Sequence, residues 1–271
     1  MNQILFTLLE HVQRLAANLF MKEKLKIIAL NVQFWPLFFL VTLLGIPMLA
    51  LWIFVRTLFS SHRVRMRIFR RMIVCYGRMV LACMFPWVRV FRELSSEKPT
   101  QPAIYICNHR STSDPFLMAL LPGEFIQVVN IWPFKIPILG WFAKWAGYLS
   151  VREMPFDQFS KTAADYLKQG ISMAAFPEGT RAGEGPMGPF HSSMFRVALA
   201  TGVPVVPVCI SGNQRIPLKG SLRLNPGTIR VRFLPPITAD TYREWSPFTF
   251  KNHVHDLIKT ELKEMDAKRL F

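Results

Sequence analysis

The sequence predicts an α/β protein in which a mostly parallel central sheet is flanked by helices and preceded by an N-terminal membrane-associated helical segment. Three observations support this fold class. Short apolar runs alternate with helical stretches from residue 103 onward, residues 34–55 contain no charged side chain, and the 271 residues carry a net charge of +16. We expect residues 1–92 to form a membrane-anchoring segment, residues 93–102 a linker, and residues 103–271 the α/β domain.

The N-terminal segment begins with an amphipathic pattern. Between residues 3 and 21, apolar residues recur every three or four positions, which predicts a helix. These residues are Ile4, Leu8, Val12, Leu15 and Leu19. The uncharged run 34–55 is long enough to span a bilayer, although Pro36, Gly45 and Pro47 interrupt it. A single span and a re-entrant helix pair that does not cross both fit this pattern.

Basic residues flank the uncharged run, and most of them follow it. From Arg56 to Arg92 there are nine arginines and no acidic residue. Because the more basic flank stays on the cytoplasmic side, we expect the α/β domain to face the cytoplasm, at the inner or plasma membrane in a bacterium. Interspersed apolar residues predict an interfacial helix whose arginines reach lipid headgroups, and the alternative is a solvated basic helix packed on the domain.

The remainder of the chain alternates between the two periodicities of an α/β domain. The expected strands are Ala103–Cys107, Phe125–Val129, Tyr148–Val151, Ile171–Phe176, Val205–Ile210 and Thr228–Phe233. The expected helices are Pro115–Leu121, Ile138–Ala146, Phe156–Lys168, Ser193–Thr201 and Thr249–Lys268. In such sheets ligands bind beyond the carboxyl ends of the strands.

Composition narrows the class of partner. The high positive charge predicts an anionic partner, and with 51% hydrophobic residues it favours anionic membrane lipids. An acidic carrier protein would also be attracted, whereas the basic residues follow no nucleic-acid-binding pattern, so we expect no nucleic acid. The four cysteines form no ligand cluster, so we expect neither a disulfide framework nor a metal site.

A histidine and an aspartate follow the first expected strand of the domain. His109 comes directly after Ala103–Cys107 and its neighbour Asn108, and Asp114 lies five residues further on. Histidine exchanges a proton near neutral pH, and a carboxylate can fix its tautomer, so the pair predicts a general base. The alternative is structural, with Asp114 as a helix N-cap before Pro115 and His109 as a hydrogen-bonded histidine at a strand end.

A second polar segment, residues 176–181, follows the expected strand Ile171–Phe176. In it Gly179 permits a tight turn, Glu178 supplies an acceptor, and Arg181 offers a guanidinium group suited to phosphate. An ordinary turn with a surface arginine is the alternative.

Together these segments resemble the glycerolipid acyltransferase family, the 1-acylglycerol-3-phosphate acyltransferases and their relatives, including those of the bacterial PlsC type. The resemblance spans four ordered blocks. These are Asn108-His109-x4-Asp114 (an HX4D motif), Ile136-Pro137-x2-Gly140 leading to Val151-Arg152, residues 176–181, and residues 203–208.

The resemblance implies transfer of a fatty acyl group from acyl-CoA or an acyl carrier protein to a lipid hydroxyl, in phospholipid biosynthesis and without a cofactor. His109 and Asp114 would be catalytic. The substrate-binding residues would be Glu178, Gly179, Thr180, Arg181 and Arg152. Arg181 would bind the acceptor's phosphate, and the turn at Glu178–Thr180 would offer backbone N–H groups to the oxyanion.

Two departures bear on the acceptor. The family often has a lysine where this chain reads Val129-Asn130, and a basic, glycine-containing segment where it reads residues 190–193. Lysophosphatidate is the expected acceptor, with another lysolipid such as a lyso-aminolipid as the alternative. A non-enzymatic lipid-binding protein and a lipid or thioester hydrolase are the other hypotheses.

Overall fold

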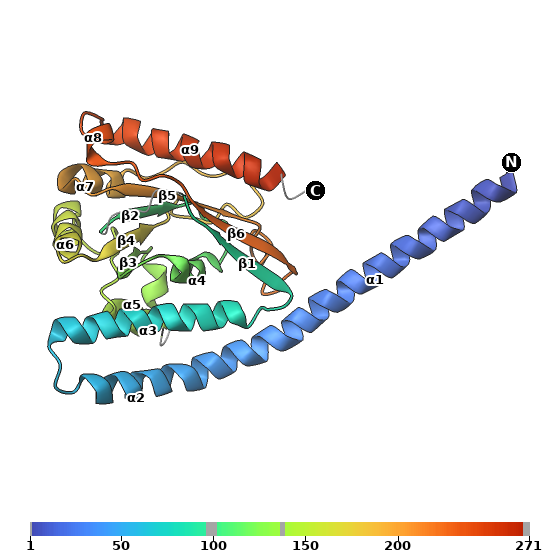
Figure 1. The fold of residues 1–271 in the computed structure, drawn as a ribbon, viewed down its shortest axis with the longest axis horizontal. Coiled ribbons are helices and arrows are strands. Elements are labelled where there is room, and N and C mark those ends of the chain that lie inside the picture. The colour runs from blue at the N-terminus through green and yellow to red at the C-terminus, as the bar shows by residue number, and fades with distance from the viewer. Residues whose placement is uncertain (1, 96–101, 136–138, 268–271) are drawn as a thin grey trace.

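The computed structural model describes residues 2–95, 102–135 and 139–267, and it contains a six-stranded sheet in the order β1-β6-β5-β2-β4-β3 (Figure 1). The strands are β1 (Val88–Glu93), β2 (Ile104–Cys107), β3 (Phe125–Val128), β4 (Ser172–Ala175), β5 (Val205–Ser211) and β6 (Gly227–Phe233). Every neighbouring pair is parallel except β5 with β6. This arrangement confirms the predicted fold class.

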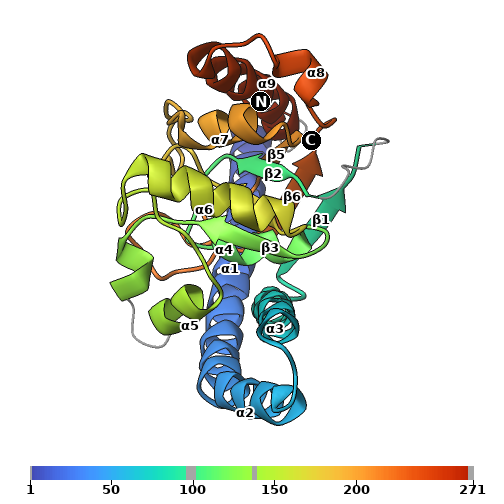
Figure 2. The ribbon, with the colours of Figure 1, turned by 90° about the vertical axis from the view of Figure 1, so that its left-hand side faces the viewer.

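Helices cover both faces of the sheet (Figure 2). One face carries α6 (Phe156–Lys168), α7 (Ser193–Thr201) and α9 (Pro247–Ala267), and the short α8 (Ala239–Tyr242) precedes α9. The other carries α3 (His62–Ala82), α4 (Asp114–Leu117) and the N-terminal helix. Successive residues of β2 therefore enter opposite cores, with Tyr105 on the α3 side and Ile106 on the α6 side.

The N-terminal segment is one long helix that runs beneath this body. It consists of α1 (Asn2–Leu40), a π-helical turn η1 (Val41–Gly45) and α2 (Ile46–Thr57). The π turn ends two residues before Pro47, which lacks the N–H that an α-helix would require there. In the described residues one helical stretch, from Arg14 to Thr57, is long and apolar enough to cross a bilayer.

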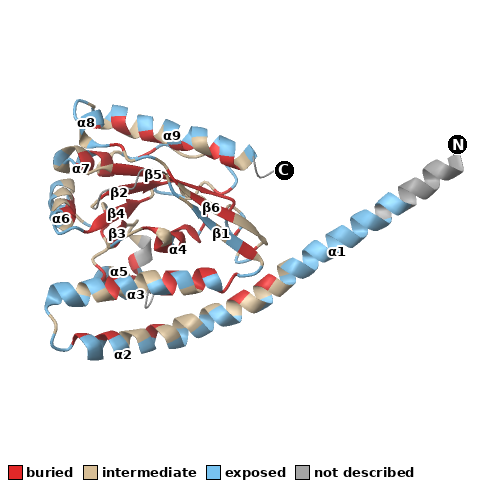
Figure 3. Cartoon of the chain, in the orientation of Figure 1, coloured by how far each residue is buried: buried red, intermediate tan, exposed pale blue. Residues whose placement is uncertain are grey.

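Polar contacts hold the middle of this helix lengthwise against the α/β body. The Asn31 side chain donates to the carbonyl of Leu224 and accepts from its N–H group, at 2.8 and 3.0 Å. The Gln33 amide donates to the carbonyls of Cys83 and Phe85 and accepts from the Trp87 indole. Residues 14–26 of α1 project away from the body and are exposed (Figure 3).

Most expected elements form, and α6 and α7 have the predicted bounds. The remaining short helices are η2 (Met118–Leu120), η3 (Trp132–Lys135) and α5 (Leu139–Trp145). The expected strand Tyr148–Val151 is wrong, because only Leu149 pairs, in an isolated bridge with Val128, before the chain turns.

The strand β1 was not predicted. It lies inside the segment expected to anchor the protein, and it pairs in parallel with β6. The sheet therefore begins at Val88, before the expected linker, of which residues 96–101 lie outside the described residues. Residues 136–138, which open the second block of the resemblance, also lie outside them.

Candidate active site

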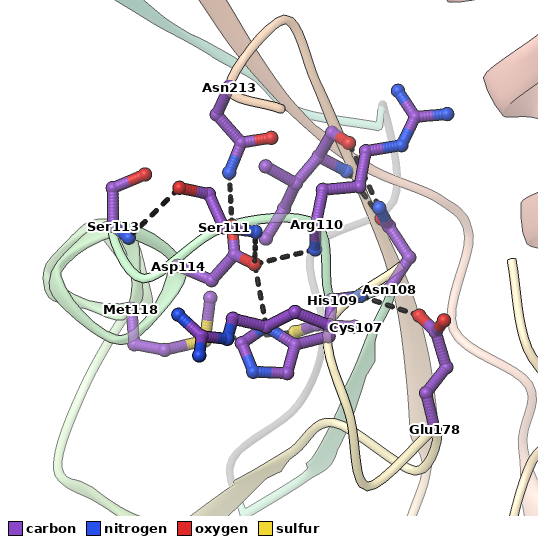
Figure 4. A network of polar contacts seen from close by, with 12 residues as sticks. Cys107, Asn108, His109, Arg110, Ser111, Ser113, Asp114, Met118, Glu178 and Asn213 are labelled. Carbon is purple, nitrogen blue, oxygen red and sulfur yellow. Dashed lines mark hydrogen bonds and ion pairs between the residues drawn. The ribbon is translucent and has the colours of Figure 1, made fainter. Parts of the chain in front are cut away.

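The site residues lie where three adjacent strands end. His109 follows β2, the segment Glu178–Arg181 follows β4, and Asn213 follows β5. Because β4 and β5 both pair with β2 in parallel, their carboxyl ends meet at one edge of the sheet. Residues separated by up to about a hundred positions are thus brought together around Asp114 (Figure 4).

The two candidate catalytic residues are in direct contact. The Nδ1 atom of His109 lies 2.6 Å from Oδ2 of Asp114. The Asp114 side chain is fully buried, whereas that of His109 is 16% exposed. The imidazole also stacks on Phe176, with ring centroids 4.6 Å apart. With Nδ1 held by the carboxylate, the opposite nitrogen Nε2 is the one available to accept a proton from a substrate.

The carboxylate of Asp114 is fixed by several further donors. Its Oδ2 atom accepts the backbone N–H groups of Arg110 and Ser111 at 2.7 and 2.8 Å, and its Oδ1 atom accepts the side-chain amide of Asn213. Asp114 itself begins α4, whose N-cap position is Ser113, with no side-chain capping bond. The N-cap interpretation of Asp114 is therefore wrong, since the carboxylate holds the residues that precede it.

Glu178 binds backbone on both sides of the site. Its Oε1 atom accepts the N–H of His109 at 2.6 Å, and its Oε2 atom accepts the N–H of Gly188 at 2.9 Å. Burial raises the pKa of the Glu178 carboxyl above its ordinary value, although these two N–H donors partly offset the effect. Both oxygens are thus occupied by the chain, and Glu178 positions His109.

The raised pKa of Glu178 makes protein stability depend on pH. Folded Glu178 holds its proton more tightly than the unfolded chain does, so the resulting stabilisation is present below about pH 4.5 and is lost as the pH rises through the folded-state pKa. We expect the free energy of unfolding in urea to fall more steeply above pH 4.5 in the wild type than in Glu178→Gln, whose amide does not titrate. Equal slopes would contradict this.

Of the remaining predicted site residues, Arg181 lies near His109 and Arg152 does not. Gly179, with a φ of +67°, and Thr180 lie exposed on the turn, and the Arg181 side chain lines a cavity beside His109. A Cβ atom at Gly179 would come within 3.3 Å of the His191 ring. Arg152 is exposed and does not line this cavity, so the structure does not bring it to His109.

The cavity connects the dyad to the N-terminal helices. Its volume is about 580 Å³, and its polar lining residues include His109, Ser113 and Arg181. Its walls are apolar side chains of α1, α2, α3, α4 and α5, among them Phe38 and Phe142. A histidine–carboxylate pair thus opens onto a chamber suited to a hydrocarbon chain.

Sequence reasoning assigned no role to Asn108, although it lies in the first block of the resemblance, and it missed Asn213 and Lys219. Asn213 binds Asp114, and Asn108 holds β2 to β5 by exchanging hydrogen bonds with the backbone of Ile210. The Lys219 ammonium donates to the Arg181 carbonyl at 2.9 Å. Asn213 and Lys219 lie just beyond β5, and the rule that ligands gather at strand ends could have identified them.

A family model described as Acyltransferase matches residues 89–211, which include the dyad and the Glu178 turn. The chain is 36% identical over 140 residues to the 1-acyl-sn-glycerol-3-phosphate acyltransferase BAT2, chloroplastic, of Brassica napus, covering 50% of this chain and 41% of that protein. The part of the chain that matches this family model is somewhat less than half of its length. The predicted resemblance is confirmed.

The chain is also similar to other known acyltransferases. One of them is the chloroplastic 1-acyl-sn-glycerol-3-phosphate acyltransferase LPAT1 of Arabidopsis thaliana. The two sequences are 35% identical over 159 residues, which are 56% of this chain and 45% of LPAT1. The chain spans about half the length of the first curated relatives it matches. The crystal structure of the 1-acyl-sn-glycerophosphate acyltransferase PlsC from Thermotoga maritima has the same fold, with a TM-score of 0.71 at 22% identity, covering 90% of this chain and 97% of that one.

Proposed function

We propose that this protein is a membrane-bound O-acyltransferase that moves a fatty acyl group from an acyl thioester to the hydroxyl of 1-acylglycerol-3-phosphate, giving phosphatidate. The observation that carries the proposal is the 2.6 Å contact between Asp114 and His109, which lines a largely apolar cavity. The match of residues 89–211 to the acyltransferase family model and the activity named for the similar proteins support it.

In the proposed reaction His109 acts as a general base. Its Nε2 atom takes the proton of the acceptor hydroxyl as the oxygen attacks the thioester carbonyl, and Asp114 stabilises the imidazolium that forms. The tetrahedral intermediate then expels the thiolate, which takes the proton back from His109, so protons balance over the cycle. General-base catalysis of this kind contributes about 10²–10⁴-fold.

The backbone of the turn after β4 is our candidate for stabilising the oxyanion. The N–H of Gly179 donates to the carbonyl of Phe176 at 3.1 Å and is therefore occupied. Among the described residues, the N–H of Thr180 donates to no other group. We therefore assign the oxyanion contact to Thr180.

The exposed surface of the N-terminal helix supports membrane association parallel to the bilayer. Leu51, Trp52, Phe54 and Val55 of α2 are exposed, and Phe59 after it is 98% exposed. Because Asn31 and Gln33 bind the body, the helix lies along the domain, which favours an embedded face over a perpendicular span. The domain would face the cytoplasm, where its arginines meet anionic lipids.

The test is a substrate panel. Purified full-length protein is incubated with radiolabelled acyl-CoA or acyl carrier protein and with lysophosphatidate, other lysophospholipids or a lyso-aminolipid. We expect label in phosphatidate. Label in another lipid would change the acceptor, free fatty acid alone would indicate a hydrolase, and no product with either donor would favour a lipid-binding protein.

Replacing Arg181 should weaken binding of the acceptor. The Arg181 side chain lines the cavity and makes no ion pair with another described residue, so it is free to pair with a phosphate. We expect Arg181→Ala to raise KM for lysophosphatidate by about 10–100-fold, as for loss of a charge-assisted hydrogen bond. Steady-state kinetics of this variant and of Arg152→Ala, whose side chain lies outside the cavity, provide the measurement and its control.

A further inference from the structure

The protein has a second cavity that shares no lining residue with the one at the dyad. Its volume is about 460 Å³, and it lies between α3, the end of α5 and α6. Arg63 and Arg70 line it from α3, Lys144 from α5, and Tyr166 from α6. We propose that this cavity binds the phosphate headgroup of an anionic glycerophospholipid in the membrane.

The wall of this cavity includes a rigid, buried cation. The Arg70 guanidinium donates to Glu124 at 2.6 Å and to the carbonyl of Ala146 at 2.8 Å, and it lies over the Tyr166 ring. Its side chain is only 7% exposed. Glu124 also accepts from Arg67 at 3.3 Å, so two arginines share one carboxylate. The local field of this wall is therefore positive.

Two further cations at the cavity are left for a ligand. The Arg63 side chain donates to the carbonyl of Gln169 at 2.8 Å, and the Lys144 ammonium lies near the Phe134 ring. Neither forms an ion pair with a carboxylate in the part of the chain that the structure describes. The lining contains two acidic residues, Glu124 and Asp165. The three basic residues Arg63, Arg70 and Lys144 outnumber them. Arginine and lysine together are well suited to phosphate.

The surroundings of the cavity favour a lipid over a soluble anion. Leu58 and Phe59, just before α3, are exposed, as are Trp141 and Trp145 on α5. Exposed tryptophans beside basic residues are typical of the membrane interface. Since α3 lies between α2 and the sheet in both views (Figures 1 and 2), the cavity is one helix layer from the apolar face of α2, at about the depth of the headgroups.

Native mass spectrometry of the full chain in detergent tests this proposal. The probes are phosphatidylglycerol and phosphatidylcholine, compared in the wild type and in the double variant Arg63→Met/Lys144→Met. We expect the wild type to retain phosphatidylglycerol preferentially, and the double variant to bind it at least tenfold more weakly. Thermal unfolding checks that both proteins remain folded, as expected for two exposed side chains.

Arg65→Met/Arg71→Met is the matched control, because it removes the same charge from exposed positions on α3 outside the cavity. We expect its affinity for phosphatidylglycerol to remain within about twofold of the wild type. Equal weakening of both double variants would overturn the site in favour of diffuse attraction, as would unchanged binding in Arg63→Met/Lys144→Met. Displacement of the lipid by an equal concentration of inorganic phosphate would overturn the lipid as ligand.

Discussion

Replacing His109 by alanine is expected to lower kcat for acyl transfer by about 10³-fold or more, because Nε2 is the base that the site offers to the acceptor hydroxyl. The loss should appear in kcat more than in KM, since the imidazole acts on the transition state and contributes little to binding either substrate. Initial rates with acyl-CoA and lysophosphatidate give the measurement. Membrane association, measured by vesicle flotation, should be unchanged, since the exposed apolar face lies on α2.

His255 on α9 provides a matched control for this experiment. It also lies beside an aspartate, with its Nδ1 atom 3.1 Å from Asp256, but it does not line the cavity. His255→Ala should therefore retain at least half of the wild-type rate. Near-normal turnover in His109→Ala would refute the general-base mechanism.

Replacing Asp114 by alanine should cost both stability and activity. Its carboxylate is fully buried and accepts from His109, Arg110, Ser111 and Asn213. Two of these hydrogen bonds, from the N–H of Ser111 and the amide of Asn213, are buried, and each such donor left unpaired costs about 1–3 kcal/mol, so we expect a loss of about 2–6 kcal/mol in the free energy of unfolding. This is a large share of the roughly 5–15 kcal/mol that holds a typical domain together.

Chemical denaturation of Asp114→Ala and Asp114→Asn separates packing from charge. The asparagine variant fills the same volume but replaces one acceptor by a donor, so it should be more stable than the alanine variant and still catalytically impaired. Asp256→Ala removes an aspartate that is 75% exposed and should change stability by less than about 0.5 kcal/mol. A loss in Asp114→Ala as small as this would mean that the buried network does not support the fold.

The sequence predicted those parts of the fold whose signals are local. The bounds of α6 follow from its helical periodicity, and those of α7 from an apolar stretch that ends at Gly202, a residue in the left-handed conformation. The strand β1 escaped prediction because Arg89 and Arg92 continue the arginine-rich pattern of α3, and because its pairing partner β6 is distant in sequence. An edge strand tolerates such charges, so composition alone did not reveal it.

The candidate site likewise contains contacts that local sequence spacing predicts and contacts that depend on the order of the strands. His109 and Asp114 are five residues apart, and their contact follows from spacing at a strand end. Asn213 is 99 residues from Asp114, and its contribution depends on β5 lying beside β2, an order that periodicity does not report. Glu178 was identified as an acceptor, but only the structure reveals that its partners are the backbone N–H groups of His109 and Gly188.

The N-terminal helices and the α/β body both line the first cavity, and this affects which truncated fragments of the protein could be made. Side chains of α1, α2 and α3 line the cavity that also contains His109, and Asn31 on α1 binds Leu224, another lining residue. Deleting these helices to obtain a shorter fragment would therefore remove lining residues of the cavity beside His109. Under the proposed function, the segment that contacts the membrane and the cavity that holds the acyl chain could not be separated by truncation.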